Sequence, residues 1–291
     1  MSATLIATAA GLATAVAWGT TDYLGARSTR KLRPIQISLV TELVSVTIAV
    51  VLYLMFGFHH VTLDQVIEIV GYSLCLNTAY LIFLKALSHG AVGVVVPLGN
   101  IYSLFTLLLA VASGQTHFKQ AEFIAILTVI FGAVILAYEK NHDKIPLRQL
   151  HYKTMLAFAA AVIWGLGFFI LNPVVTELPW QTITITSEVA SIILVAMIFV
   201  ATTPNNVARQ VRQAFGSKVA YLTAVVGQIG MLTFYFGSHE AGNVVIPTVL
   251  STCGPLVASF WGRVFDNEKI GWAKRVGAVL VVAGIIAINA S

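Results

Sequence analysis

The chain reads SHGAVGVVVP at residues 88–97 and SHEAGNVVIP at residues 238–247, 150 positions later. Trp18-Gly19 likewise recurs as Trp164-Gly165, at an offset of 146. Further matched pairs follow in the same order along the two halves: Ser38 with Thr184, Thr41 with Ser187, Glu42 with Glu188, Ser45 with Ser191, and Gly132 with Gly284. Because chance does not produce an ordered series of this length, the chain is an internal duplication.

The composition places the chain in a membrane. Of its 291 residues, 58% are hydrophobic and only 10% are charged, whereas a soluble domain usually carries about 25% charged residues. This excludes a soluble enzyme and a disordered chain. The net charge of +5 lies between apolar runs and not on one face, which excludes nucleic-acid binding. Two cysteines make no disulfide framework, and no Cys/His cluster indicates a metal site.

Apolar runs of spanning length follow one another along the chain. A helix that crosses a bilayer needs about 20 mostly apolar residues. The runs predict an all-α integral membrane protein with ten helices: 4–26, 34–56, 65–87, 92–112, 120–138, 154–171, 181–202, 217–237, 243–262 and 272–290. No basic residue precedes the first run, so we expect a permanent helix and not a cleaved signal peptide.

Each half holds five predicted helices, so the second half enters the membrane with the opposite orientation. Inverted repeats are typical of transporters, where they form two similar arrangements around a central site. We expect a first repeat at 1–138, a hydrophilic linker at 139–153 and a second repeat at 154–291.

The basic residues predict the orientation of the bundle. Of the 17 Lys and Arg residues, all but Lys119 fall on one predicted side of the membrane. The positive-inside rule assigns such loops to the cytoplasm. We therefore expect the linker at 139–153 to be cytoplasmic and both termini to be extracytoplasmic.

Three features lead to a family resemblance. Trp-Gly lies in the first helix of each half, Val-Val-x-Pro opens each fourth helix, and a short polar turn precedes each last helix. In these features the chain resembles the paired EamA domains of the drug/metabolite transporter superfamily. That family typically has Gly-Glu and a basic residue in the turn; the second half keeps Glu268-Lys269, whereas the first has Gly114-Gln115-Thr116. The resemblance implies a carrier of small metabolites, amino acids among them, in the bacterial inner membrane.

Glu42 and Glu188 are repeat mates near the membrane midplane. Glu42 lies about eight residues into its helix, or about 12 Å at 1.5 Å per residue, in a hydrocarbon core about 30 Å thick. Intramembrane acids usually mark transport pathways, so we expect both to line a watery cavity and to take part in proton coupling. A structural role, with hydrogen bonds to Ser and Thr hydroxyls, is the alternative.

Asp22 lies four residues after Trp18 on the same helical face, which suits an acid beside an aromatic platform. The alternatives are a surface pair of Asp22 with Arg27 or Arg30, and a packing role for Trp18 and Trp164.

Polar and aromatic residues deep in other helices complete the candidate site. The predicted solute-binding residues are Trp18, Asp22, Asn77, Tyr80, Asn100, Tyr102, Trp164, Gln228 and Tyr235. The resemblance implies that the third, fourth, eighth and ninth helices surround a central cavity. Pro97 and Pro247 lie inside apolar runs, where proline bends a helix, so we predict hinges there; the alternative is that they start helices.

No Lys or Arg lies deep in any predicted helix, which disfavours phosphate-bearing solutes. The residues favour a secondary carrier that moves a zwitterionic or cationic solute, such as an amino acid or amine, by alternating access, with protons as a candidate coupling ion. The alternatives are a flippase for lipids or lipid-linked sugars and, less favoured, an intramembrane enzyme. We expect no enzyme, because the chain has no H-E-x-x-H, G-x-S-x-G or P-loop motif. We also expect no cofactor, metal or nucleic acid, and a monomer or weak dimer whose other partners are membrane lipids.

Overall fold

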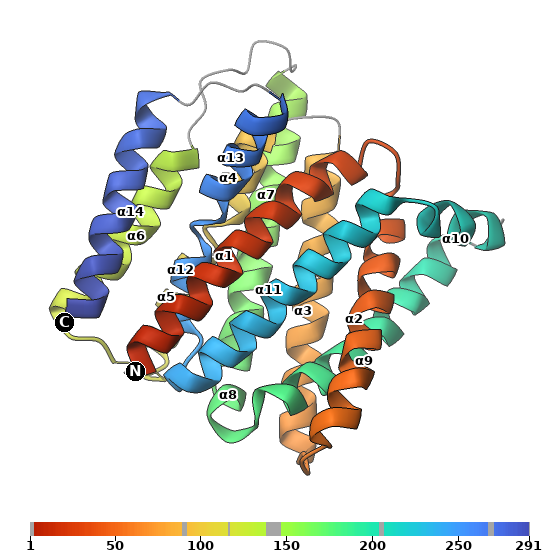
Figure 1. Cartoon of the computed structure of the whole chain (residues 1–291), viewed down its shortest axis with the longest axis horizontal. Helices are drawn as coiled ribbons and strands as arrows, with labels where there is room; N and C mark the ends of the chain where they lie inside the picture. The colour runs from red at the N-terminus through yellow and green to blue at the C-terminus, as the bar shows by residue number, and fades with distance from the viewer. Residues whose placement is uncertain are drawn as a thin grey trace.

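The structure is a computed structural model that describes residues 3–88, 92–115, 117–137, 147–203, 207–266 and 271–290. Every regular element within these residues is a helix, and they form one bundle (Figure 1). The helices are α1 (Ala3–Ser28), α2 (Pro34–Phe56), α3 (Leu63–Leu87), α4 (Val92–Gly99), α5 (Tyr102–Ala112), α6 (Gln120–Ala137), α7 (Leu147–Leu171), α8 (Val174–Glu177), α9 (Trp180–Thr202), α10 (Val207–Phe215), α11 (Lys218–Ala241), α12 (Val245–Ser251), α13 (Gly254–Asp266) and α14 (Trp272–Ala290).

The predicted helices map onto these elements in order, with three differences. The predicted helices 92–112 and 243–262 are each broken into two, as α4 with α5 and as α12 with α13. The short helices α8 and α10 were not predicted. The helix predicted to start at residue 154 starts at Leu147, inside the predicted linker, because no residue from 147 to 153 breaks a helix. The rest of that linker, 139–146, lies outside the described residues.

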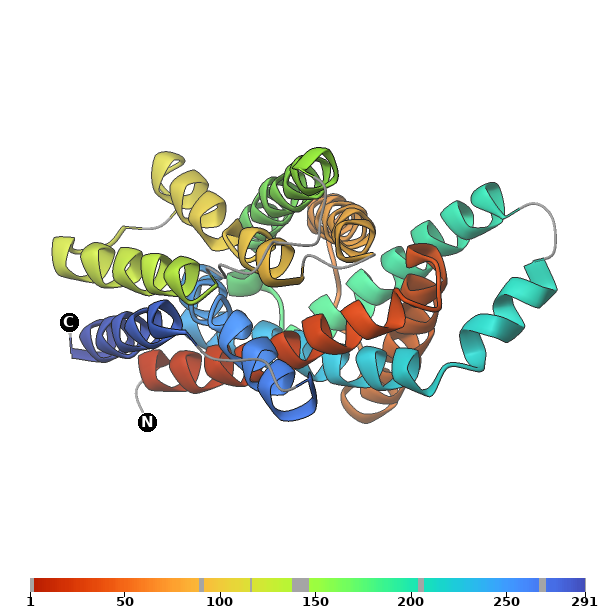
Figure 2. The ribbon, with the colours of Figure 1, turned by 90° about the horizontal axis from the view of Figure 1, so that it is seen from above.

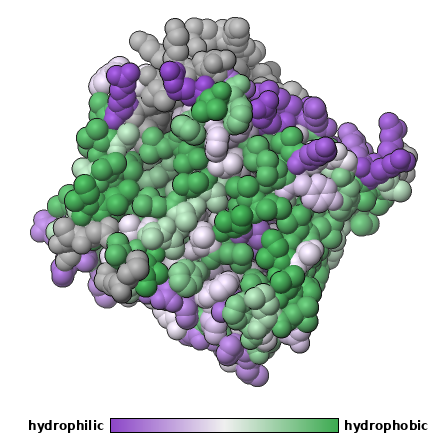
Figure 3. Space-filling model, in the orientation of Figure 1, coloured by the Kyte–Doolittle hydropathy of each residue, from purple (hydrophilic) through white to green (hydrophobic). Residues whose placement is uncertain are grey.

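Length and hydropathy identify membrane-spanning helices directly. Eight segments of the described chain are long and apolar enough to cross a bilayer, and the apolar parts of α6 and α14 are shorter. Hydrophobic side chains cover the middle of the face in Figure 3, with hydrophilic ones toward its upper and lower edges. The count of ten crossings therefore stays a prediction for α6 and α14.

The helix α10 differs from its neighbours in being amphipathic. Its Arg209 and Arg212 are exposed, whereas Ala214 is buried. It lies at the outer edge of the bundle (Figure 2), where the side-chain amide of Gln36 donates to the carbonyl of Gln210 (3.1 Å). A polar, basic helix of nine residues is too short to span a bilayer.

The two broken helices explain what Pro97 and Pro247 do locally. Each proline lies inside the first half-helix, and the break follows shortly after it. At the end of α4 the Asn100 amide donates to the carbonyl of Val96 (2.8 Å), and at the end of α12 the Ser251 hydroxyl donates to a carbonyl three residues back (2.7 Å). The Val96 carbonyl also accepts from the backbone N–H of Asn100 (3.0 Å), so these side chains add local hydrogen bonds at the break, which stabilise it. That the prolines act as hinges stays a prediction.

The principal helix contacts join one repeat to the other. The helix α1 packs along α11, and its repeat mate α7 packs along α3; α2 packs on its own mate α9, and α6 on its mate α14. A Cβ atom on Gly132 would lie 2.8 Å from the backbone nitrogen of Val281, and one on Gly284 would lie 2.9 Å from the carbonyl oxygen of Ala125. The two glycines thus let α6 and α14 approach closely at the edge of the bundle (Figure 1).

Candidate functional site

A cavity of about 130 Å³ lies between the two repeats. For comparison, an apolar cavity of about 150 Å³ holds benzene. The lining residues are Trp18, Thr21, Asp22, Thr41, Glu42, Ser45, Leu76, Asn77, Tyr80, Phe83, Asn100, Tyr102, Trp164, Phe168, Glu188, Ser191, Thr223, Gly227, Gln228 and Met231. The cavity therefore has room for a small solute of roughly the size of benzene.

Helical periodicity brings these side chains to the cavity. Residues three or four apart share one helical face, as with Trp18 and Asp22 on α1 and with Glu188 and Ser191 on α9. Trp18 and Asp22 lie in the half of α1 that ends at the basic loop 27–33, whereas Phe168 lies near the other end of the bundle, close to the end of α7.

Glu42 and Glu188 meet across the repeat interface. Both are almost fully buried, with 6% and 5% of their surface exposed. The Gln228 amide donates to Glu188 Oε1 (3.0 Å), while Gln228 Oε1 accepts from the Ser45 hydroxyl (2.8 Å). The two carboxyl groups themselves lie close enough for a hydrogen bond, yet Glu42 Oε2 has no donor. Because two ionised carboxylates can only accept, this pair needs a proton or a cationic donor between them.

Asp22 forms a second acidic group in the cavity. The Asn100 amide, at the break between α4 and α5, donates to Asp22 Oδ2 (3.3 Å). Arg27, one of its candidate surface partners, instead donates to the hydroxyl of Tyr23 (2.7 Å). The Tyr80 hydroxyl, bonded to Thr41, lies near the carboxyl groups of both Asp22 and Glu42.

Two tryptophans form aromatic walls. The Trp18 ring stacks on Phe234, with 5.5 Å between ring centroids, and a Cβ atom on Gly230 would lie 2.4 Å from that ring. The Trp164 indole N–H donates to the carbonyl of Leu76 (3.3 Å). The glycine and the indole hydrogen bond fix both rings against the cavity.

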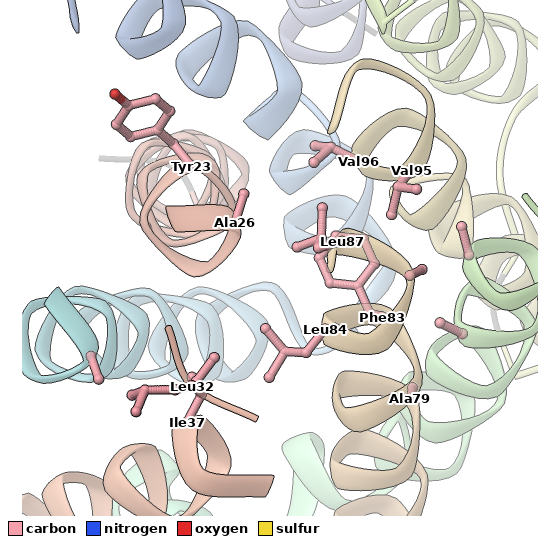
Figure 4. Packing of buried hydrophobic residues seen from close by; sticks show 14 of the residues in the cluster. Tyr23, Ala26, Leu32, Ile37, Ala79, Phe83, Leu84, Leu87, Val95 and Val96 are labelled. Carbon is pink, nitrogen blue, oxygen red and sulfur yellow. The ribbon is translucent and has the colours of Figure 1, made fainter. Parts of the chain in front are cut away.

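Two buried clusters adjoin the cavity. Beyond Trp18, away from the basic loops, lie the buried rings of Tyr72, Phe168, Phe234 and Tyr235. Toward the basic loops, Phe83 joins a second cluster that Figure 4 shows from close by, with Ala26, Leu84 and Leu87 among its members. The cavity shares lining residues with both clusters, Trp18 and Phe168 with the first and Phe83 with the second.

Ten of the eleven predicted solute and proton-coupling residues come together in this cavity. The exception is Tyr235, which lies behind the wall, where its hydroxyl contacts Ser187 and Tyr72 at 3.1 Å each. Asn77 lines the cavity and donates to the Ser191 hydroxyl (2.8 Å). Pro97 and Pro247 lie outside the lining, within their half-helices.

Sequence reasoning missed half of the lining. The unpredicted members are Thr21, Thr41, Ser45, Leu76, Phe83, Phe168, Ser191, Thr223, Gly227 and Met231. A usable signal existed for some of them, because Thr41 and Ser45 lie on the helical face of Glu42 and both have polar repeat mates. Within the described residues, no group of three or more His, Cys, Asp or Glu side chains is placed to hold a metal ion.

Comparison with known proteins agrees with this architecture. A solved structure titled "Crystal structure of protein" has a TM-score of 0.69 to this chain at 18% identity, covering 98% of this chain and 96% of the other. No curated protein matches the chain. The model of the EamA-like transporter family matches twice, at residues 5–138 and 152–290. Two matches that together cover nearly the whole chain show that this multi-pass membrane protein belongs to the EamA-like transporter family.

Proposed function

We propose that this chain is a secondary carrier of a small cationic or zwitterionic metabolite, such as an amine or amino acid. One observation carries the proposal: the residues that line the cavity in the described part of the chain include Asp22, Glu42 and Glu188 but no Lys, Arg or His. A buried acid is stable only when it is protonated or paired with a donor or a cation. An amino group supplies both a positive charge and several N–H donors, whereas a phosphate would meet only like charge.

The pair of glutamates supports proton exchange as the coupling step. An ammonium group and a proton compete for the same Glu42 and Glu188 oxygens, so arrival of the solute releases the proton. Because Glu42 belongs to one repeat and Glu188 to the other, movement of the repeats against each other separates the pair. Each carboxyl group can then reach water on one side of the membrane, as alternating access requires.

The dimensions of the cavity support a small solute more than a lipid-linked sugar. A cavity of about 130 Å³ has no room for a sugar diphosphate headgroup. We place the carrier in the bacterial inner membrane with both termini extracytoplasmic, since Arg27, Arg30 and Lys31 lie exposed together at one end of the bundle.

Solute-induced thermal stabilisation of the purified protein tests the solute class. A panel of amines, amino acids, neutral vitamins and phosphates is compared at equal concentration. We expect amines or amino acids to raise the unfolding temperature by several degrees, because a ligand that binds only the folded state stabilises it. Stabilisation by phosphates or neutral solutes alone would contradict the proposal.

Proteoliposomes test the coupling. An imposed pH gradient should drive uphill uptake of the stabilising solute by the wild type, whereas Glu42→Gln or Glu188→Gln should abolish accumulation and retain binding. Glu240→Gln is the matched control, because Glu240 is exposed at the end of α11 and lies outside the cavity. Uphill transport by both cavity variants would assign the glutamates a structural role.

A further inference from the structure

The cavity contains two anionic groups that are held separately. Asp22 projects from α1 and is bonded to Asn100 at the α4–α5 break. Glu42 and Glu188 project from α2 and α9, and Glu188 is bonded to Gln228 of α11. No hydrogen bond between described residues joins Asp22 to the glutamates, and the Tyr80 hydroxyl lies near both groups. One cavity thus offers two places for a cation.

Among the residues that the structure describes, neither anionic group has a basic partner in the cavity, because its lining includes no Lys, Arg or His. Glu42 is 6% exposed, and its Oε2 is buried without a donor. A solute with one positive charge satisfies one group and leaves the other unpaired, which is unfavourable for a buried carboxylate.

Much of the cavity lining beside the two anionic groups is apolar. Trp18, Leu76, Phe83 and Met231 line the cavity together with the acids. Methylene groups pack well against such side chains, and the tryptophan face also attracts a neighbouring ammonium group. The lining therefore combines two anionic groups with apolar surface.

We propose that the preferred solute is a short α,ω-diaminoalkane, with one ammonium group at Asp22–Asn100 and the other at Glu42–Glu188. This inference rests on the proposed function and narrows its solute class. A cavity close to the size that holds benzene accepts about six to eight non-hydrogen atoms, which corresponds to chains of four to six carbons. Both amino groups carry a charge at neutral pH, since aliphatic amines such as that of Lys have a pKa of about 10.4.

Wild-type protein alone provides the first test. The affinities of α,ω-diaminoalkanes with two to seven carbons are measured by calorimetry in detergent at pH 7.5, beside 1-aminoalkanes of the same lengths. We expect the best diamine to bind about tenfold or more tightly than its matched monoamine, because its second ammonium group forms a further charge-assisted hydrogen bond. The optimum chain length reports the separation of the two acidic groups. Equal affinities of diamine and monoamine at every length would overturn the inference.

Variants assign the two ends. Asp22→Asn, and separately the double variant Glu42→Gln/Glu188→Gln, should reduce the diamine-to-monoamine ratio to about one, while Glu240→Gln should leave it as in the wild type. A diamine-to-monoamine affinity ratio that stays at the wild-type value in Asp22→Asn would overturn the assignment of Asp22. This single variant tests the two-ended solute even if the double variant does not fold.

The outcomes separate this inference from the proposed function. If monoamines bind and diamines bind no better, the two-ended solute is wrong and the cation carrier stands. If no amine binds but neutral or anionic solutes do, the proposed function itself is wrong.

Discussion

Glu42 and Glu188 occupy equivalent positions in opposite repeats, yet only Glu188 has its own hydrogen-bond donor, the amide of Gln228. Gln228 belongs to the second repeat and also accepts from Ser45 of the first. The two acids are therefore symmetric in sequence but differ in their hydrogen bonds. In this conformation Glu188 accepts a hydrogen bond from a side-chain amide, whereas Glu42 needs a proton or a cation.

This inequality predicts that Glu42→Gln stabilises the protein. The amide can donate to Glu188, as a protonated carboxyl group would, and it removes the charge of a buried carboxylate that lacks a donor, whose cost is about 1–3 kcal/mol. The gain should be largest at high pH and disappear at low pH, where a protonated carboxyl group has the same donor. Thermal unfolding in detergent from pH 5 to 9 measures it. A variant less stable than the wild type at pH 9 would contradict the assignment.

The chain of hydrogen bonds from Ser45 through Gln228 to Glu188 predicts non-additive stability changes. Gln228→Leu leaves both neighbours without their partner, at about 1–3 kcal/mol each. Ser45→Ala removes one of those neighbours, so the double variant should lose less stability than the sum of the single losses. A double-mutant cycle on the free energy of unfolding gives the coupling, and additivity within about 0.5 kcal/mol would show that the two residues act independently.

Gly230→Ala should displace the Trp18 ring and impair transport. A Cβ atom at Gly230 would lie 2.4 Å from the indole, which leaves the ring no room in its present place. Gly25→Ala is the control, because the nearest atom to a Cβ there is 3.7 Å away, on Leu84. We expect solute affinity to fall about tenfold in Gly230→Ala, as it should also fall in Trp18→Ala and Trp164→Ala. Full transport by all three variants would reduce both tryptophans to packing residues.

Gly132→Ala should lower stability with little effect on solute affinity. The added methyl group would meet the backbone of α14 at 2.8 Å, and such overpacking costs about 1–3 kcal/mol. Since α6 contributes no residue to the cavity lining, the folded fraction should bind solute as the wild type does. Gly71→Ala is the control, with its nearest atom 3.9 Å away. Thermal unfolding measures the loss of stability, and calorimetry on the folded fraction measures the solute affinity. A large loss of affinity would show that α6 shapes the site.

Accessibility to an impermeant thiol reagent tests the orientation. In a background of Cys75→Ala and Cys253→Ser, single cysteines replace Lys31 and Asp64, which are exposed at opposite ends of the bundle. The cysteine at Asp64 should be labelled in intact cells and that at Lys31 only after lysis, as should one at Asn141 in the linker. The reverse pattern would invert the predicted topology.

The fold followed from the sequence because burial in a membrane imposes long apolar runs. The prediction of 34–56 agrees with α2 at both ends. The prolines predicted bends in these two helices, but not that each helix would end and a new one begin, because hydropathy does not report side-chain contacts such as those of Asn100 and Ser251 with backbone carbonyls.

The candidate site was predictable where the repeat and the residue type agreed, as at Glu42 and Glu188. The candidate site was not predictable where two polar residues lie on different faces of one helix, because the sequence does not say which face lines the cavity. Tyr235 and Gln228 lie on α11, and only Gln228 faces the cavity. Phe168, the repeat mate of Asp22, lines the cavity as an aromatic ring, so symmetry of position did not imply symmetry of chemistry.

The seam at Gly132 and Gly284 bears on how the repeats can move. Each glycine lets the backbone of the other repeat's helix approach within contact distance, and neither α6 nor α14 contributes a residue to the cavity lining. This edge can stay closed while the rest of the bundle rearranges, because backbones in contact can swivel without pulling interlocked side chains apart. We expect this seam to act as a pivot when the repeats move, so that opening of the cavity depends on the side chains of the two buried clusters beside it.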